Sequence, residues 1–220
     1  RGLRMLTTAV TVRVLEGFDD RSVGPESWEA LLGATNTDIV YLTWHWQRAW
    51  WEAFGEGDLL LIAAERNGEV VAFAPFFTRW GMVFFVGSER QADYLDFVGD
   101  VGDPEVLEAI LETARAGVSG FQGFELDVIP DSSSTGKQLQ EAGRRLGLAC
   151  YDEWGEGAAA PALDLVGCAE VARAAANRKS VLKDERFFRR EGPFEVRHFR
   201  DGEAIHPHLE EFFEQHIERR

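Results

Sequence analysis

The stretch LLLIAAERNGEVVAFAPFF, residues 59–77, decides the fold because it encodes two apolar segments joined by a tight turn. Asn67 and Gly68 tolerate positive φ angles, and such a pair between two strand-like segments is a strong local signal for a two-residue β-hairpin. The flanking segments LIAAE and VVAFAPF are apolar and strand-sized. We therefore predict an antiparallel hairpin at the centre of the fold.

Strand-like and helix-like segments alternate along the rest of the chain. Further strands are predicted at residues 9–15, 82–86, 95–98, 124–129, 148–151, 161–165 and 194–198. Helices are predicted at residues 25–34, 44–54, 104–117, 135–147, 169–190 (in two pieces) and 203–220. Thr43 is the predicted N-cap of the helix at 44–54, and Gly55 is its predicted stop. This order predicts an α/β fold with a mixed sheet and helices on both faces. The strand–helix pair at 194–220 resembles the pair at 9–34 and predicts the start of a second, similar unit.

The composition excludes several classes of function. The chain has 220 residues, 45% of them hydrophobic, and a formal net charge of −15. This charge argues against a broad nucleic-acid surface and against an anionic membrane surface. The longest apolar runs are strand-sized, so no membrane span is predicted. The two cysteines, Cys150 and Cys168, form no disulfide framework or zinc site, and we expect a cytoplasmic protein without a metal.

The positive charge is concentrated in one segment. Residues 178–200 hold eight basic and four acidic side chains, although the whole chain is acidic. Lys179, Lys183, Arg186 and Arg190 follow helical spacing and form one stripe. The stripe has two interpretations: a binding site for an anionic substrate or phosphate, or a solvated face of a connecting helix.

Four segments carry a resemblance to a known family. They are YLTWHWQRAWWEAFGEG (41–57), IAAERNGEVVAFAPFF (62–77), VGSERQADYLDFVGD (86–100) and NRKSVLKDERFFRREGPFEVRHF (177–199). With the order of the elements, they resemble the CelD/BcsL-type acetyltransferases. These are tandem proteins of the GNAT acyltransferase fold and are related to the Fem transferases. In that family a complete second unit follows, and here the resemblance ends within its first helix, at residues 216–220.

The resemblance implies a first GNAT-like domain at residues 1–166, followed at 167–220 by the basic connecting helix and the start of a second domain. It also implies transfer of an acetyl group from acetyl-CoA to an amine or hydroxyl of a small-molecule or saccharide acceptor, and a role in polysaccharide biosynthesis. Two alternatives stay open: a non-catalytic lobe that binds the acceptor, and an aminoacyl transferase of the Fem type. The net charge of −15 weighs against the transfer RNA that the last would need.

The candidate catalytic residues are Asp93, Tyr94 and Asp96, in a DYLD stretch that has a counterpart in the family. Two carboxylates and a phenol could hold an amine or hydroxyl, or act as a general base. On a strand, Asp93 would face one way, and Tyr94 and Asp96 the other. Arg90 is a candidate counter-ion. The alternative is a strand edge with solvated acids.

Trp46, Lys179, Lys183 and Arg186 complete the candidate substrate-binding residues. Trp46 belongs to a cluster of aromatic residues at helical spacing that is more often core than a stacking platform for sugars.

The junction at residues 98–104, VGDVGDP, is where a GNAT enzyme would bind the CoA pyrophosphate. Asp100 and Asp103 place negative charge there, and Pro104 lacks an N–H group, so the sequence predicts a poor phosphate site and an ordinary N-cap at Asp103.

Overall fold

A computed structural model describes residues 9–21, 23–35, 37, 39–88, 91–151, 169–193 and 195–219. The chain divides into two compact units, Arg1–Glu153 and Trp154–Arg220. The predicted domain boundary after residue 166 and the predicted strand 161–165 lie outside the described residues.

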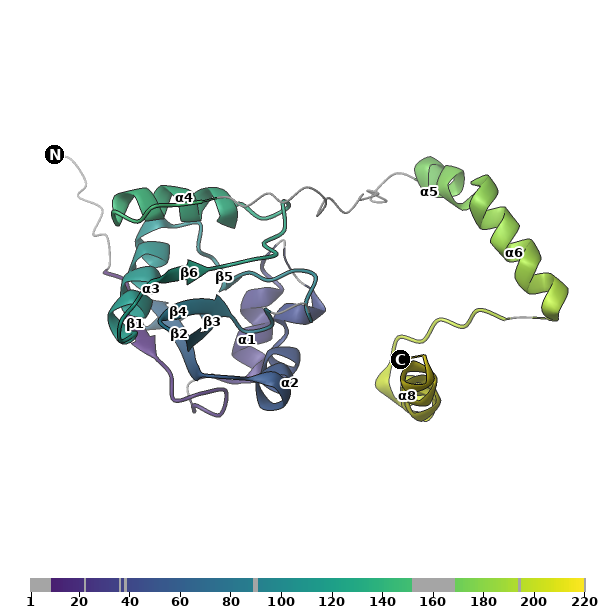
Figure 1. The fold of residues 1–220 in the computed structure, drawn as a ribbon, viewed down its shortest axis with the longest axis horizontal. Helices are drawn as coiled ribbons and strands as arrows, with labels where there is room; N and C mark the ends of the chain where they lie inside the picture. The colour runs from purple at the N-terminus through teal and green to yellow at the C-terminus, as the bar shows by residue number, and fades with distance from the viewer. Residues whose placement is uncertain are drawn as a thin grey trace. The chain divides into compact units, whose positions relative to one another are not determined.

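The first unit is built on a mixed sheet of six strands (Figure 1). Its strands are β1 (Thr11–Val14), β2 (Asp58–Arg66), β3 (Glu69–Arg79), β4 (Met82–Phe85), β5 (Val98–Gly99) and β6 (Gly123–Glu125). The order is β1-β2-β3-β4-β6, with β5 paired to β3 beyond the end of β4. All neighbours are antiparallel except β4 and β6, which run parallel. The predicted α/β class with a mixed sheet is thus confirmed.

The central hairpin forms as predicted. Asn67 and Gly68 have φ angles of 57° and 80°, and Arg66 pairs with Glu69 across the turn. Both turn residues occupy the left-handed region, which Asn and Gly tolerate better than other residues, so the turn fixes the register of β2 against β3.

Helices flank the sheet. Those of the first unit are α1 (Pro25–Leu32), the 3-10 turn η1 (Val40–Leu42), α2 (Trp44–Phe54), α3 (Pro104–Gly117) and α4 (Thr135–Arg145). Phe73 and Phe77 on β3 point to one face of the sheet. There the Phe73 ring stacks on Trp28 of α1, with 4.8 Å between ring centroids. The centroid of the Phe77 ring lies 5.9 Å from that of Trp50 of α2. Phe76 points to the opposite face. Both faces of β3 are therefore buried, as its uninterrupted apolar sequence requires.

The predicted helix caps are confirmed. The Thr43 side chain accepts a hydrogen bond from the Trp46 N–H group at the start of α2, and Gly55 follows its last turn. The Asp103 side chain accepts from the Glu105 N–H group at the start of α3. These short-range bonds fix where α2 and α3 begin.

Several predicted strands are shorter or missing. Only residues 98–99 and 123–125 form the strands predicted at 95–98 and 124–129. Residues 148–151 and 195–198 are not strands. A strand persists only where a neighbour satisfies its backbone groups, and no strand is present among the described residues of the second unit. The prediction of a second strand–helix pair is therefore wrong for residues 195–198.

The second unit consists of helices. They are α5 (Ala169–Ala176), α6 (Lys179–Glu191), α7 (Gly202–Ile205), the 3-10 turn η2 (His206–His208) and α8 (Leu209–Glu218). The predicted helix at 169–190 indeed forms in two pieces. The predicted helix at 203–220 is interrupted at η2, where Pro207 cannot donate a backbone hydrogen bond. None of the described residues of this unit is buried.

Candidate functional site

On the side of β3 that faces away from β2, which we call its outer edge, the pairing is interrupted between two short partner strands. The candidate site lies at this interruption. β4 pairs with residues 76–79 of β3, whereas β5 pairs with residues 72–73. Between them, residues 87–88 and 91–97 lie outside the sheet, and we call this segment, which contains the DYLD stretch, the bulge. The Leu95 N–H group donates to the Val128 carbonyl at 3.0 Å, which ties the bulge to the segment after β6.

Pro75 explains where the bulge begins. Its carbonyl accepts a hydrogen bond from the Val86 N–H group at 2.8 Å, so position 75 faces the outer edge. In an antiparallel ladder the same residue would donate its own N–H group back to the Val86 carbonyl. Proline has no such group, so the ladder cannot close at this pair and the chain leaves the sheet.

Gln47 of α2 replaces the missing donor. Its Nε2 donates to the Val86 carbonyl at 3.1 Å and to the Tyr41 carbonyl at 2.7 Å. The Gln47 side chain is fully buried. One amide group thus satisfies the carbonyl that Pro75 leaves open and fixes the segment that carries Tyr41 beside the bulge.

Tyr41 and Asp93 meet at this point. The Tyr41 hydroxyl donates to Asp93 Oδ2 at 2.9 Å, across 52 positions of sequence. This hydrogen bond is the main cause that raises the pKa of Tyr41, with desolvation and the nearby charge of Asp93 adding to it. Tyr94 is also close enough to contribute to that shift. Asp93 and Tyr94 are both exposed, so this polar cluster is open to solvent.

Trp46 forms the aromatic side of the same cluster. Its indole meets the Tyr41 ring edge-on at 5.3 Å between centroids. The bulge passes directly over it, because a Cβ atom at Gly87 would lie 2.8 Å from both the Trp46 ring and the Leu95 side chain. The structure therefore brings together Trp46, Asp93 and Tyr94 of the predicted site, and adds Tyr41. We call these four residues the Tyr41–Asp93 cluster.

Asp96 is placed differently from the prediction. Residues 95–97 are not a strand, and the expected alternation fails: Asp93 and Tyr94 are both exposed, whereas Leu95 and Asp96 are buried. Asp96 Oδ1 accepts a hydrogen bond from the Phe97 N–H group, and the hydroxyls of Ser133 and Thr135, at the start of α4, lie close enough to interact with the carboxylate. Burial raises the pKa of Asp96, and these polar partners oppose the shift. Asp96 therefore anchors the bulge to α4.

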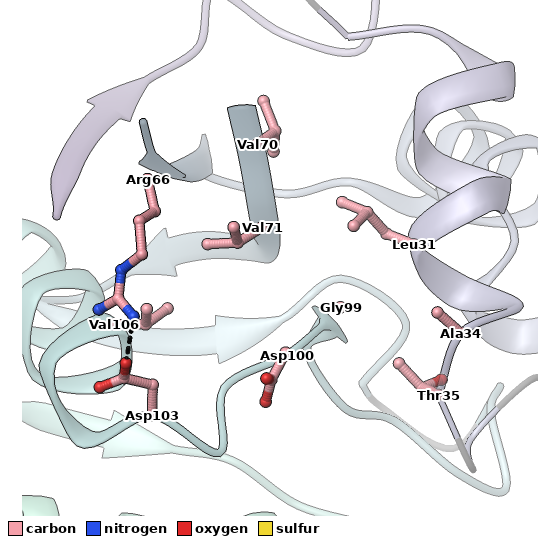
Figure 2. Close-up of a pocket in the computed structure, with 10 residues that line it drawn as sticks. All are labelled: Leu31, Ala34, Thr35, Arg66, Val70, Val71, Gly99, Asp100, Asp103 and Val106. Atoms are coloured by element: carbon pink, nitrogen blue, oxygen red, sulfur yellow. Dashed lines mark ion pairs between the residues drawn. The ribbon is translucent and has the colours of Figure 1, made fainter. Parts of the chain in front are cut away.

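The N-terminus of α3 borders a groove of about 270 Å³ (Figure 2). Asp100 Oδ1 accepts from the Gly102 N–H group and Asp103 Oδ1 accepts from the Glu105 N–H group, at 2.8 and 2.9 Å. Arg66 pairs with Asp103 at 2.6 Å. Burial would raise the pKa of Asp103, but the Glu105 amide and the Arg66 guanidinium lower it. Carboxylates thus occupy the N–H groups that would bind a phosphate.

The remaining predicted residues lie elsewhere. Arg90 lies outside the described residues. Lys179, Lys183 and Arg186 are exposed on α6 of the second unit, where the Arg186 Nε donates to the Leu182 carbonyl of the same helix. Among the described residues, no cluster of His, Cys, Asp or Glu side chains could hold a metal ion. None of the described helices combines the length and apolarity that crossing a membrane requires.

Sequence reasoning missed Tyr41, Pro75 and Gln47. A signal was present for Pro75, because a proline within an otherwise continuous apolar strand indicates an edge or a bulge. No local pattern indicates that Tyr41 would meet Asp93, since the contact depends on the path of the bulge.

Comparisons of the chain with protein-family models, with curated proteins and with solved structures give no match. The structure defines the class as an α/β protein with a mixed, interrupted sheet and a polar–aromatic cluster at the interruption.

The role of Gln47 can be tested with a double-mutant cycle. Gln47→Leu leaves the Val86 and Tyr41 carbonyls buried without their donor and should lower the free energy of unfolding by about 2–4 kcal/mol. Pro75→Ala restores an N–H group that faces Val86, so the double variant should recover about 1 kcal/mol of that loss. Urea unfolding of the four proteins measures both quantities. If the losses of stability in the two single variants simply add in the double variant, Gln47 does not substitute for the N–H group that Pro75 lacks.

Asp96 should make stability depend on pH. Because burial raises the pKa of Asp96 in the folded state, its stabilising contribution is complete below the ordinary value of about 3.9 and is lost as the pH rises through the raised pKa. Asp96→Asn removes this titration and retains a side-chain oxygen that can accept from the Phe97 N–H group. Relative to the natural protein, the variant should therefore gain stability as the pH rises from 4 to 8. A difference that stays constant with pH would contradict this assignment.

Proposed function

We propose that the chain is part of an acyltransferase that moves an acetyl group from acetyl-CoA to a hydroxyl or amine, and that the Tyr41–Asp93 cluster binds the acceptor. The observation that carries the proposal is the Tyr41–Asp93 hydrogen bond at the interrupted edge of the sheet. It joins an exposed carboxylate to a phenol whose ring meets the Trp46 indole edge-on. Sequence resemblance to the CelD/BcsL-type acetyltransferases supports the reaction class.

The chemistry of the cluster suits an acceptor. Asp93 uses Oδ2 to accept from Tyr41, and a carboxylate has further lone pairs for a hydroxyl or ammonium group. As the acceptor oxygen or nitrogen bonds to the acyl carbon and the carbon–sulfur bond of the donor breaks, Asp93 can take the acceptor proton. Tyr41 keeps its own proton under these conditions, because its pKa is raised. Trp46 and Tyr94 offer ring surfaces that can orient an acceptor with C–H faces.

The described residues do not fit the pyrophosphate of CoA at the N-terminus of α3. The N–H groups of Gly102 and Glu105 are already bonded to Asp100 and Asp103, and Pro104 has none. We therefore assign no step of the reaction to this helix terminus. The exposed stripe of Lys179, Lys183 and Arg186 on α6 is our proposed contact for an anionic substrate or for phosphates of the donor.

Because carboxylates already occupy the N–H groups at the N-terminus of α3, a second candidate function is also favoured. In it, this chain is a non-catalytic lobe that binds the acceptor for a catalytic unit located elsewhere. The two candidates share the Tyr41–Asp93 cluster and differ in whether this chain binds acetyl-CoA.

Two titrations test these proposals. Glucosamine is a suitable probe of the acceptor site because it carries hydroxyls and an ammonium group. Asp93→Asn should weaken its binding about tenfold, since a hydrogen bond to a charged group is lost, and Tyr41→Phe should have a smaller effect. Asp58→Asn, an exposed acid at the start of β2, serves as the matched control. Equal affinity in the Asp93 variant and the control would overturn the acceptor assignment.

Calorimetric titration of acetyl-CoA into the 220-residue chain separates the two candidates. Absence of binding, with glucosamine binding intact, favours the acceptor lobe. Micromolar binding favours an enzyme, and if Asp103→Ala or Asp100→Ala strengthens it, the donor site lies at α3 after all. If neither acetyl-CoA nor glucosamine binds, the acyltransferase proposal is wrong.

A further inference from the structure

The turn between β3 and β4 carries a residue that its backbone does not favour. Trp80 and Gly81 have φ angles of 55° and 78°, nearly the same as the 57° and 80° of Asn67 and Gly68 in the preceding hairpin. Asn-Gly is the preferred pair for this geometry, whereas a bulky residue in the left-handed region is a true outlier. The same chain thus uses the favourable residue in one turn and an unfavourable tryptophan in the other.

Burial does not explain the tryptophan, because Trp80 is 78% exposed. Its indole is held from one side by Arg79, whose guanidinium carbon lies 4.4 Å from the ring centroid. Arg79 in turn pairs with Glu56 at 3.0 Å. The result is a flat aromatic ring, oriented by a cation–π contact and bordered by a guanidinium and a carboxylate.

We propose that Trp80, Arg79 and Glu56, here called the Trp80 platform, bind a neutral saccharide chain. An exposed indole can stack on the C–H face of a sugar ring, while the guanidinium and the carboxylate supply a donor and an acceptor for its hydroxyls. A net charge of −15 disfavours an anionic polysaccharide.

The surroundings favour a sugar over a protein partner. Gly81 follows Trp80 in the turn, its carbonyl accepts from the Gln122 N–H group at 2.8 Å, and the Gly120 carbonyl lies close by. A protein interface needs about 800 Å² per partner with an apolar centre. The neighbours of the turn, Gly81, Gly120 and Gln122, add little apolar area to the exposed indole, so they do not provide such a centre.

This platform is separate from the Tyr41–Asp93 cluster. Trp80 precedes β4, and the bulge that holds Asp93 follows it, so the two sites lie at opposite ends of that strand. Saccharide binding at Trp80 involves no acyl group and no proton transfer. The inference therefore goes beyond the proposed function, and either can fail without the other.

Native gel electrophoresis tests the platform with dissolved polysaccharides as probes. We expect the full chain to be retarded by hydroxyethyl cellulose, a neutral β-glucan, and not by alginate, an anionic polysaccharide. Trp80→Asn should reduce the apparent affinity for the neutral polymer at least fivefold. Tyr151→Ser, which removes another highly exposed aromatic residue, is the matched control and should bind like the natural protein.

The effect of Trp80→Asn on stability is measured in parallel. Because Asn suits the turn, Trp80→Asn should leave the midpoint of thermal unfolding unchanged or raise it. Weaker saccharide binding with unchanged or higher stability supports the proposal. Equal retardation of Trp80→Asn and the natural protein, absence of retardation by the neutral polymer, or retardation by alginate alone would overturn it. A change of oligomeric state in Trp80→Asn would also overturn it and identify a protein interface.

Discussion

The missing N–H group of Pro75 is the constraint on which the first unit depends. β3 pairs with β2 on one side and with β4 and β5 on the other. The ladder on this second, outer side can form only where β3 offers both a hydrogen-bond donor and an acceptor. At Pro75 it offers the acceptor alone, so Val86 is the last residue to bond before the chain departs. Gln47 then satisfies the Val86 carbonyl and holds the Tyr41 carbonyl with the same nitrogen. The position of the candidate site thus follows from one backbone hydrogen bond that proline cannot make.

The sequence predicted those parts of the fold that short-range chemistry determines. The Asn67-Gly68 turn and the caps at Thr43 and Asp103 need only neighbouring residues, and all three form as expected. The bulge could not be predicted in the same way, because its path depends on a proline in another strand and on a glutamine from α2. Periodicity treated residues 93–96 as a strand and therefore gave the wrong orientation for Asp96.

The acidic character of the chain is part of its local structure. At the start of α3, Asp100 and Asp103 bond to backbone N–H groups, and Arg66 balances the charge of Asp103. A helix N-terminus that binds a phosphate leaves these groups to the ligand. The same residues that stabilise α3 therefore remove it as an anion site, and in our proposal a donor with phosphates binds another surface. Stability and ligand binding compete here for the same few hydrogen-bond donors.

Three departures from local preference border the short strand β4 and its neighbours. Pro75 lies inside β3, Trp80 occupies a left-handed turn position before β4, and Val128 has a φ of 50° just after β6. Val128 is β-branched and gains nothing from that conformation locally, yet its carbonyl holds the Leu95 N–H group of the bulge. By contrast, the Asn67-Gly68 turn and the N-caps Thr43 and Asp103 agree with the backbone they adopt. Such departures persist where the surrounding structure requires them, and they concentrate at functional sites. Their grouping around one four-residue strand supports our proposal of two binding sites beside β4.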